Sequence, residues 1–292
     1  MGVLLISIAV IGATVIWPIN RWIMHNGGRS KVYGFWLSAS AAFASACAAL
    51  ILGQSLRQPT VWAIGAVIGF AFAIGYCLVI MYCLRIGPVG PAVAMNNMGL
   101  VWPVVLGALW LKPHPLNGWL IMGVVLVGLS LFAFGFSRHG STPRTQASAI
   151  SLRWVLWAFL GWILAGISMT AQLVGSLYAS NSPFAVVFAF TTISAAILAP
   201  FVIRPRKDWS NRKEMFAGMA NGVFTALIGA ATLTALNYVG PEVVFPFTVA
   251  APLILVLILG QFLYHEHLDR LEWSACFLCV GGLVGLSLGQ PS

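Results

Sequence analysis

Charge is scarce in this sequence. Only 7% of its 292 residues are charged, against about 25% in a soluble domain, while 60% are hydrophobic and the mean hydropathy is +0.94. A soluble core cannot bury this much apolar surface, so an integral membrane protein is predicted. A secreted enzyme, a nucleic-acid-binding protein and a disordered chain are excluded. The net charge of +9 indicates no nucleic-acid partner, because the 15 Lys and Arg residues are scattered between apolar blocks.

Acidic and histidine side chains are missing from the middle of every apolar run. They fall in predicted loops or at helix ends, at Asp208, Glu214, Glu242, Glu266, Asp269, Glu272, His25, His114, His139, His265 and His267. A proton-driven pump usually keeps such a group at mid-membrane, and a cation exporter needs a buried negative charge, so both classes are disfavoured. His265-Glu266-His267 is interpreted as a solvated loop rather than a metal site. With no nucleophile–base pair or phosphate loop, no catalytic residue, metal or cofactor is predicted.

Cysteines are few and lie within apolar blocks, at Cys47, Cys77, Cys83, Cys276 and Cys279. They are expected to be buried small hydrophobes, because the CxxC of Cys276 and Cys279 falls inside a predicted helix. The apolar stretch 2–17 follows no basic segment and has no clear cleavage site, so it is predicted to be a first spanning helix rather than a signal peptide.

The apolar runs predict ten membrane spans, since a helix needs about 20 apolar residues to cross a bilayer. They are Val3–Met24, Val32–Leu52, Thr60–Leu84, Pro88–Leu111, Leu116–Ser137, Leu152–Tyr178, Pro183–Ile203, Glu214–Tyr238, Pro241–Tyr264 and Leu271–Leu288. Short connections predict antiparallel neighbours. Two links are long and polar, 138–151 and 204–213, and the first falls near the middle of the chain.

Basic residues predict the orientation of these spans. The odd-numbered connections and their helix ends hold 13 Lys and Arg residues, and the even-numbered ones hold only Arg57 and Lys112. The positive-inside rule then places the odd connections in the cytoplasm and both termini on the outer side.

The two halves of the chain repeat each other at an offset of 153 residues. In this register Gly65 and Gly69 match Gly218 and Gly222, and further pairs are Ala73 with Ala226, Gly87-Pro88 with Gly240-Pro241, Leu106-Gly107 with Leu259-Gly260, His114 with His267, and Val127-Gly128 with Val280-Gly281. An odd number of spans per half inverts the second half relative to the first. The predicted fold is therefore an all-α integral membrane protein with ten transmembrane helices in two inverted five-helix repeats, 1–137 and 152–292, joined by the linker 138–151.

These motifs resemble the EamA-type drug/metabolite transporters. The segment Arg85-Ile-Gly-Pro, the following helix to Leu111, and the glycines Gly118, Gly123 and Gly128 resemble half of such a transporter, and Val239-Gly-Pro-Glu, Pro246, Tyr264-His-Glu-His and Gly281 repeat the pattern. Asn26-Gly-Gly before Tyr33-Gly34 also resembles the glucose/rhamnose porter branch. The resemblance implies a transporter without specifying its substrate. Many members of the family are drawn with cytoplasmic termini, whereas the distribution of basic residues in this chain predicts that its own termini lie on the outer side.

Asn96 and Asn97 lie near the middle of the predicted fourth span. Adjacent positions point about 100° apart on a helix, so at least one amide is expected to face a cavity. Their matches in the second half are Val249 and Ala250, so the repeat does not require amides here. This favours substrate binding, with a hydrogen bond between helices as the alternative.

Helix breaks are predicted at Gly99, Pro103, Pro246 and Pro252. Proline frees backbone carbonyls that can bind substrate or allow a helix to bend during gating. A static kink is the alternative.

Small-residue faces recur on the third, sixth and eighth spans and usually indicate close helix packing. Their polar members and neighbours are predicted to line the substrate cavity, with packing as the alternative: Tyr76, Ser168, Gln172, Asn221 and Thr225. Trp17, Asn20 and Arg21 cluster on the first span. Arg21 either reaches the membrane surface or binds a substrate carboxylate or phosphate, and Trp17 either anchors the helix at the interface or stacks on a substrate ring.

The sequence thus predicts a secondary transporter in the cell inner (plasma) membrane, a monomer or homodimer in the lipid bilayer. It is expected to move a small polar metabolite, neutral or anionic, by alternating access. A sugar-uptake porter and an amino-acid or metabolite exporter remain open. A membrane-bound enzyme or a structural helper protein is the alternative from another class.

Overall fold

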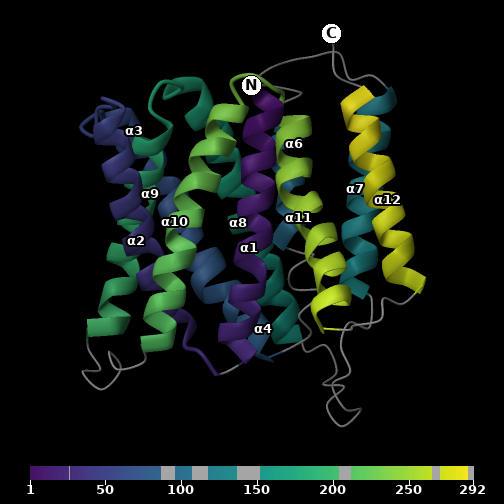
Figure 1. Cartoon of the computed structure of the whole chain (residues 1–292), viewed down its shortest axis with the longest axis horizontal. Helices are drawn as coiled ribbons and strands as arrows, with labels where there is room; N and C mark the ends of the chain where they lie inside the picture. The colour runs from purple at the N-terminus through teal and green to yellow at the C-terminus, as the bar shows by residue number, and fades with distance from the viewer. Residues whose placement is uncertain are drawn as a thin grey trace.

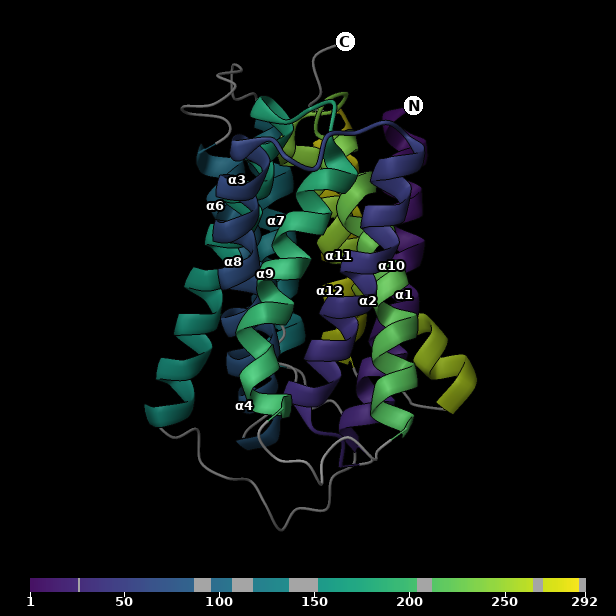
Figure 2. The same ribbon diagram turned by 90° about the vertical axis from the view of Figure 1, so that its left-hand side faces the viewer.

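The described part of the computed structural model is helical. It covers residues 1–25, 27–86, 96–106, 118–136, 152–203, 212–264 and 270–288, and these hold helices and short turns without a strand. Several predicted features lie outside the described residues: Asn26, Gly87-Pro88, Lys112 and His114, the linker 138–151, Asp208, and His265-Glu266-His267 with Asp269. The helices stand side by side as an upright bundle (Figures 1 and 2).

Most helices begin and end where the sequence predicts. They are α1 (Gly2–His25), α2 (Ser30–Ile51), α3 (Pro59–Ala71), α4 (Met81–Ile86), α6 (Val101–Leu106), α7 (Gly118–Phe136), α8 (Leu152–Tyr178), α9 (Pro183–Ile203), α10 (Arg212–Ala235), α11 (Pro241–Tyr264) and α12 (Arg270–Leu288). Three of them, α8, α9 and α11, match the predicted spans at both ends. Six described helical stretches are long and apolar enough to cross a membrane, and three shorter apolar helices accompany them.

Two spans change helix type along their length. The third passes from α3 into the π-helix η1 (Phe72–Ile80) and then into α4, and the fourth has the 3₁₀ turn η2 (Met98–Leu100) before α6. The 3₁₀ turn contains Gly99 and precedes Pro103, where a break is predicted. The π-helix was not predicted from the sequence. Such wide turns often occur at functional sites.

The prolines Pro246 and Pro252 do not end the ninth span, and their role as sites of bending or gating stays a prediction. Both prolines lie inside α11, which is one continuous α-helix. A proline removes one backbone donor without necessarily ending a membrane helix, because neighbouring groups satisfy the carbonyl it leaves.

Exposed side chains on the outside of the bundle are apolar. Val3, Phe43 and Ile51 are each more than 70% exposed, as expected where a helix faces lipid rather than water. Cys47 is also exposed, which corrects the prediction that all five cysteines are buried. The other four are buried and form no disulfide with a described residue.

One end of the bundle, here called the basic end, gathers the described basic residues of the odd connections. They are Arg29, Lys31, Arg153, Arg212, Lys213 and Arg270. Lys31 lies 4.5 Å from the centre of the Phe201 ring at the end of α9, and Arg153 lies 5.7 Å from that of Tyr82 on α4. The start of α1 and the last turn of α12 lie at the opposite end (Figure 1). The first turn of α1 and the last described turn of α12 are therefore on the side away from the basic end.

Glycines set the closest helix contacts. A Cβ added at Gly222 on α10 would lie 1.8 Å from the Ser40 hydroxyl oxygen, 2.4 Å from the Leu37 carbonyl oxygen and 2.9 Å from the Ala41 nitrogen of α2. Gly218, one turn earlier, presses on the same helix. Two of the three atoms met at Gly222 belong to backbone, which cannot rotate away.

Replacing Gly222 with alanine is therefore expected to destabilise the protein by about 1–3 kcal/mol, the usual cost of overpacking. Thermal unfolding of the purified protein in detergent measures the change. Gly128→Ala is the matched control, because a Cβ at Gly128 meets nothing within 4 Å. Equal melting temperatures for the two variants would contradict this packing.

Candidate functional site

Four polar side chains from four helical segments form one hydrogen-bonded group, here called the Asn–Tyr cluster. It consists of Asn20, Tyr33, Tyr76 and Asn221. The Asn20 Nδ2 donates to the Tyr76 hydroxyl at 2.6 Å, and the Asn20 Oδ1 accepts from Asn221 Nδ2 at 3.1 Å and from the Tyr33 hydroxyl. Asn221 also donates to the Tyr33 hydroxyl. The cluster unites three predicted site residues, Asn20, Tyr76 and Asn221.

The cluster lies toward the basic end. Asn20 stands five residues before the end of α1, and Tyr33 occupies the first turn of α2. Tyr76 is at the middle of the π-helix η1, where its ring stacks on Phe72 with centroids 5.2 Å apart. Asn221 lies on α10. The sequence pattern does not single these residues out, because each lies inside an apolar span rather than on a polar helix face or in a loop.

One hydrogen-bond acceptor of the cluster has no donor among the described residues. Asn221 is completely buried, and its Oδ1 meets no donor among the described residues. An unpaired amide oxygen in a membrane interior costs free energy. It is a group that water or a solute can satisfy.

The repeat itself does not call for these polar groups. The positions 153 residues away from the cluster are Ile68, Leu173, Val186 and Gly229. Ile68, Leu173 and Val186 are buried apolar side chains. The same test that singled out Asn96 and Asn97 in the sequence also singles out Tyr33, which sequence reasoning missed as a site residue.

Two predicted loop or helix-end acids are buried. Glu214, in the first turn of α10, is 1% exposed, and Glu242 in the first turn of α11 is also buried. Glu214 Oε1 accepts the backbone N–H of Arg29 at 2.8 Å, and its Oε2 lies 3.5 Å from the Arg29 guanidinium. This carboxylate therefore ties the start of α2 to the start of α10 at the basic end.

Ser168 and Gln172 lie on the inner side of α8. Ala165, on the same stripe, is 2.9 Å from where a Cβ of Gly99 on the fourth span would stand, whereas Gly161 and Gly175 of this stripe meet Ile80 and Ile64 on the third span. Both polar side chains are half-buried, and no hydrogen bond joins either to another described residue. Thr170, between them in the sequence, lines a groove on the outside of the bundle, and its buried hydroxyl meets no partner among the described residues. By helix rise, Gln172 lies about 9 Å inside the end of α8, within the apolar part of the bundle.

Asn96 and Asn97 precede the 3₁₀ turn. Asn97 is buried and Asn96 half-buried, and the Asn96 Nδ2 lies 3.5 Å from the Asn97 Oδ1, at the limit of a hydrogen bond. Their proposed contact with a cavity stays a prediction.

Three predicted site residues remain, Thr225, Trp17 and Arg21. The Thr225 hydroxyl donates to the Asn221 carbonyl of its own helix at 2.8 Å. Trp17 and Arg21 lie on α1, and their side chains are outside the described part of the structure. Their roles stay predictions.

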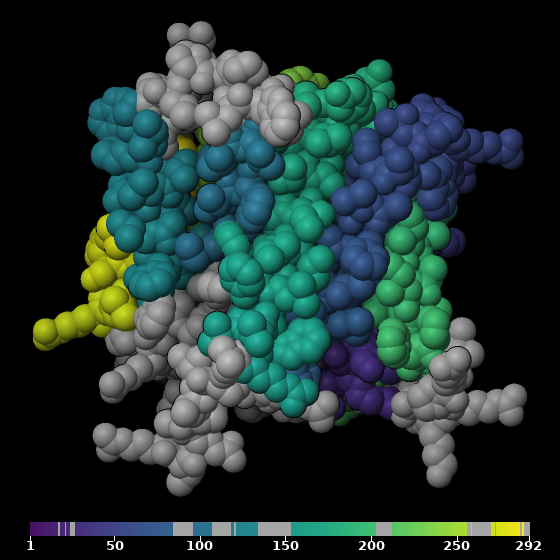
Figure 3. All heavy atoms as spheres, turned by 180° about the vertical axis from the view of Figure 1, so that it is seen from behind, coloured from purple at the N-terminus to yellow at the C-terminus, as the bar shows by residue number. Residues whose placement is uncertain are grey.

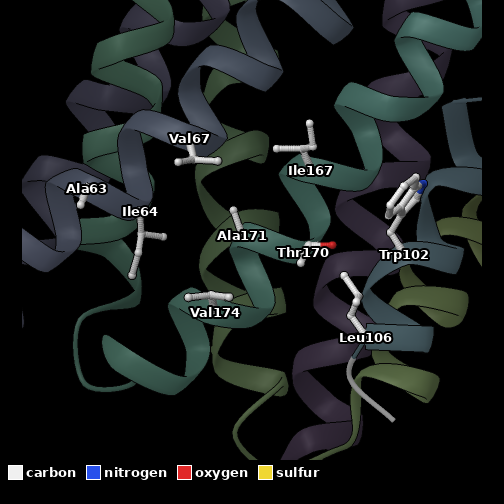
Figure 4. Close-up of a pocket in the computed structure, with 9 residues that line it drawn as sticks. All are labelled: Ala63, Ile64, Val67, Trp102, Leu106, Ile167, Thr170, Ala171 and Val174. Carbon is white, nitrogen blue, oxygen red and sulfur yellow. The ribbon is translucent and has the colours of Figure 1, made fainter. Parts of the chain in front are cut away.

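A described hollow of the bundle is apolar and lies elsewhere. It is a groove of about 530 Å³ between α3, α6 and α8 (Figure 4), lined by exposed side chains such as Val67, Trp102 and Ile167. Figure 3 shows these three helices side by side on one face of the molecule. Because the groove opens sideways, toward lipid, and offers almost only carbon atoms, it does not suit a polar solute.

The fold and the buried polar groups define an α-helical multi-pass membrane protein. The sequence profile of the EamA-like transporter family matches residues 152–288. The predicted resemblance to EamA-type drug/metabolite transporters is thereby confirmed for the second half of the chain, which is similar to an EamA-like transporter domain. The glucose/rhamnose branch stays a prediction.

The fold extends beyond the matched half. A solved structure described only as "Crystal structure of protein" has a TM-score of 0.78 to this chain at 19% sequence identity, covering 98% of this chain and 96% of that chain. At this identity the similarity shows the fold alone. No curated protein matches the chain.

Proposed function

We propose that this protein is a secondary transporter that moves a small polar metabolite, neutral or anionic, by alternating access between two inverted five-helix halves. The halves are 1–137 and 152–292, joined by the linker 138–151, and each contributes five of ten spans. Substrate then binds between them near the midplane, as in other inverted-repeat transporters.

The inverted repeat is supported by helix contacts that recur when each helix is replaced by its match in the other half. The offset of 153 residues pairs α1 with α8, α2 with α9 and α3 with α10. α2 packs on α10 as α9 packs on α3, and α1 packs on α10 as α8 packs on α3. The paired helices α1 and α8 run in opposite directions (Figures 1 and 2). This is the arrangement that a twofold axis in the membrane plane produces.

The glycine contacts repeat at the same offset. A Cβ at Gly218 would meet Trp36 and Leu37, and a Cβ at Gly65 would meet Ala189 and Phe190. Trp36 and Ala189 are 153 residues apart, and so are Leu37 and Phe190. Apolar composition alone is not expected to place both contact pairs, Trp36 with Ala189 and Leu37 with Phe190, at the same offset as the matched glycines.

The observation that carries the solute proposal is the unpartnered polar stripe of α8. Ser168 and Gln172 face the bundle interior without a hydrogen-bond partner in the described structure. A membrane interior leaves such groups to water or to solute, so we place the solute against this stripe, with Asn96 and Asn97 on the facing span. Asn20, Tyr76, Asn221 and Thr225 are proposed to meet solute along the path toward the basic end, and Trp17 and Arg21 to lie near that path.

The polar groups of the α8 stripe and of Asn96 and Asn97, against which the solute is placed, carry no charge. Of the two buried acids, Glu214 lies in the first turn of α10 at the basic end, away from the α8 stripe, and Glu242 lies in the first turn of α11. A solute rich in hydrogen-bonding groups, neutral or anionic, therefore fits better than a cation. Sugar uptake and amino-acid or metabolite export remain the two candidate directions.

The excess of basic residues at the basic end supports a cytoplasmic position for that end and an outer position for both termini. In a bacterial cell this corresponds to the inner membrane. A monomer or homodimer is compatible with the helix arrangement.

Uptake of labelled metabolites into proteoliposomes tests the function. A panel of sugars, neutral amino acids and organic anions is expected to contain at least one solute that accumulates over protein-free liposomes and competes with its unlabelled form. Equal uptake in both kinds of liposome across the panel would count against a transporter of small polar metabolites.

A further inference from the structure

We propose that the contact between α2 and α10 is a polar gate that closes the pathway at the basic end. The proposal rests on alternating access as the proposed function. The polar seam is defined as Arg29 and Tyr33 at the start of α2, with Glu214 and Asn221 on α10. The apolar seam is its counterpart 153 residues away, made by Ser182 and Val186 at the start of α9, with Val61 and Ile68 on α3.

The two seams share their geometry and differ in chemistry. Glycines hold both helix pairs close, Gly218 and Gly222 in the polar seam and Gly65 and Gly69 in the apolar one. Glu214 stands where the other seam has Val61, and Asn221 stands where it has Ile68. The twofold relation therefore fixes the close approach, while the choice of side chains makes one seam polar.

Hydrogen bonds close the polar seam at two levels. At the membrane surface, Glu214 accepts the Arg29 backbone N–H at 2.8 Å and lies 3.5 Å from its guanidinium. Two helical turns deeper on α10, Asn221 binds Tyr33 and Asn20, and Asn20 binds Tyr76. The seam thus binds α1, α2 and the π-helix of the first half to α10 of the second half.

Parting the polar seam exchanges these hydrogen bonds for bonds to water, which leaves only a small net cost for each bond. Parting the apolar seam instead exposes Val61, Ile68 and Val186 to water, and each buried aliphatic side chain resists this by its hydrophobic transfer free energy. The polar seam therefore parts at a wet surface at a lower free-energy cost than the apolar seam. Glu214, which is 1% exposed in the closed seam, becomes solvated when it opens.

Thiol labelling tests this gate without a known solute. The five native cysteines are replaced, and Thr225→Cys puts a single reporter on α10, one turn deeper than Asn221. An impermeant maleimide is added to sealed vesicles that expose the basic end. Glu214→Gln and Tyr33→Phe each weaken the seam while keeping the size of the side chain. Each is expected to raise the labelling rate about tenfold, the effect of losing one or two buried hydrogen bonds, one of them to a charged group.

The matched control is Val61→Ala, the counterpart of Glu214 in the apolar seam. It is expected to leave labelling from the basic end unchanged. Unchanged labelling in both Glu214→Gln and Tyr33→Phe would overturn the gate. So would faster labelling from both faces of the membrane together with a lower melting temperature, since that pattern indicates a loosened bundle. Because no transport is measured, the result stands apart from the test of transport, and a protein that moves no solute of the panel can still show or lack the gate.

Discussion

Replacing Asn20 with leucine is expected to lower the free energy of unfolding by about 2–5 kcal/mol. Asn20 is the centre of the Asn–Tyr cluster, because its amide bonds Tyr76, Tyr33 and Asn221 at once. Hydrogen bonds between membrane helices contribute about 0.6–2 kcal/mol each, and leucine removes three. Chemical unfolding in mixed micelles or steric trapping in bicelles measures the change.

The control for this prediction is Asn237→Leu. The Asn237 side chain is exposed and donates one 3.3 Å bond to the Ser180 carbonyl, so its loss is expected to cost under about 1 kcal/mol. Similar losses at Asn20 and Asn237 would show that the cluster adds nothing to the bundle. Tyr33→Phe, which removes one hydroxyl of the cluster, is expected to fall between the two.

Replacing Gln172 with leucine is expected to abolish transport while the protein stays folded. Leucine suits a membrane interior, and the Gln172 amide makes no hydrogen bond with a described residue that the change would break. The change is therefore expected to weaken solute binding, because the hydrogen-bonding groups of the solute would meet an apolar surface instead of an amide. Initial uptake rates in proteoliposomes, for the solute that the panel identifies, measure the effect alongside the melting temperature.

Gln54→Leu is the matched control, with the same residue type and the opposite expectation. The Gln54 Oε1 accepts the backbone N–H groups of Phe184 at 3.0 Å and Ala185 at 3.2 Å, so it caps the start of α9. Its loss is expected to cost about 0.5–2 kcal/mol of stability and to leave the solute affinity of the folded fraction intact. Full transport by Gln172→Leu would remove α8 from the solute site.

The sequence alone determined the class of this protein and the position of most helices. Runs of apolar residues and the scarcity of charge act locally along the chain, so α8, α9 and α11 follow from length and composition. The sequence also determines that the basic residues gather at one end. Successive helices are antiparallel, so the odd-numbered connections, which hold most of the basic residues, lie at the same end. The confirmed EamA resemblance rests on the same kind of local signal, short glycine and proline motifs at fixed spacing.

Only the tertiary structure decided which polar groups meet. Asn20, Tyr76 and Asn221 stood in the sequence as three separate candidates, and the bundle joins them through Tyr33, 13 residues from one and 188 from another. The π-helix that carries Tyr76, the burial of Glu214 and the continuity of α11 through its prolines also depend on neighbouring helices. A span's hydropathy fixes that it lies in the membrane, but its rotation and its partners are set by packing between helices, and those contacts are not written in any single segment.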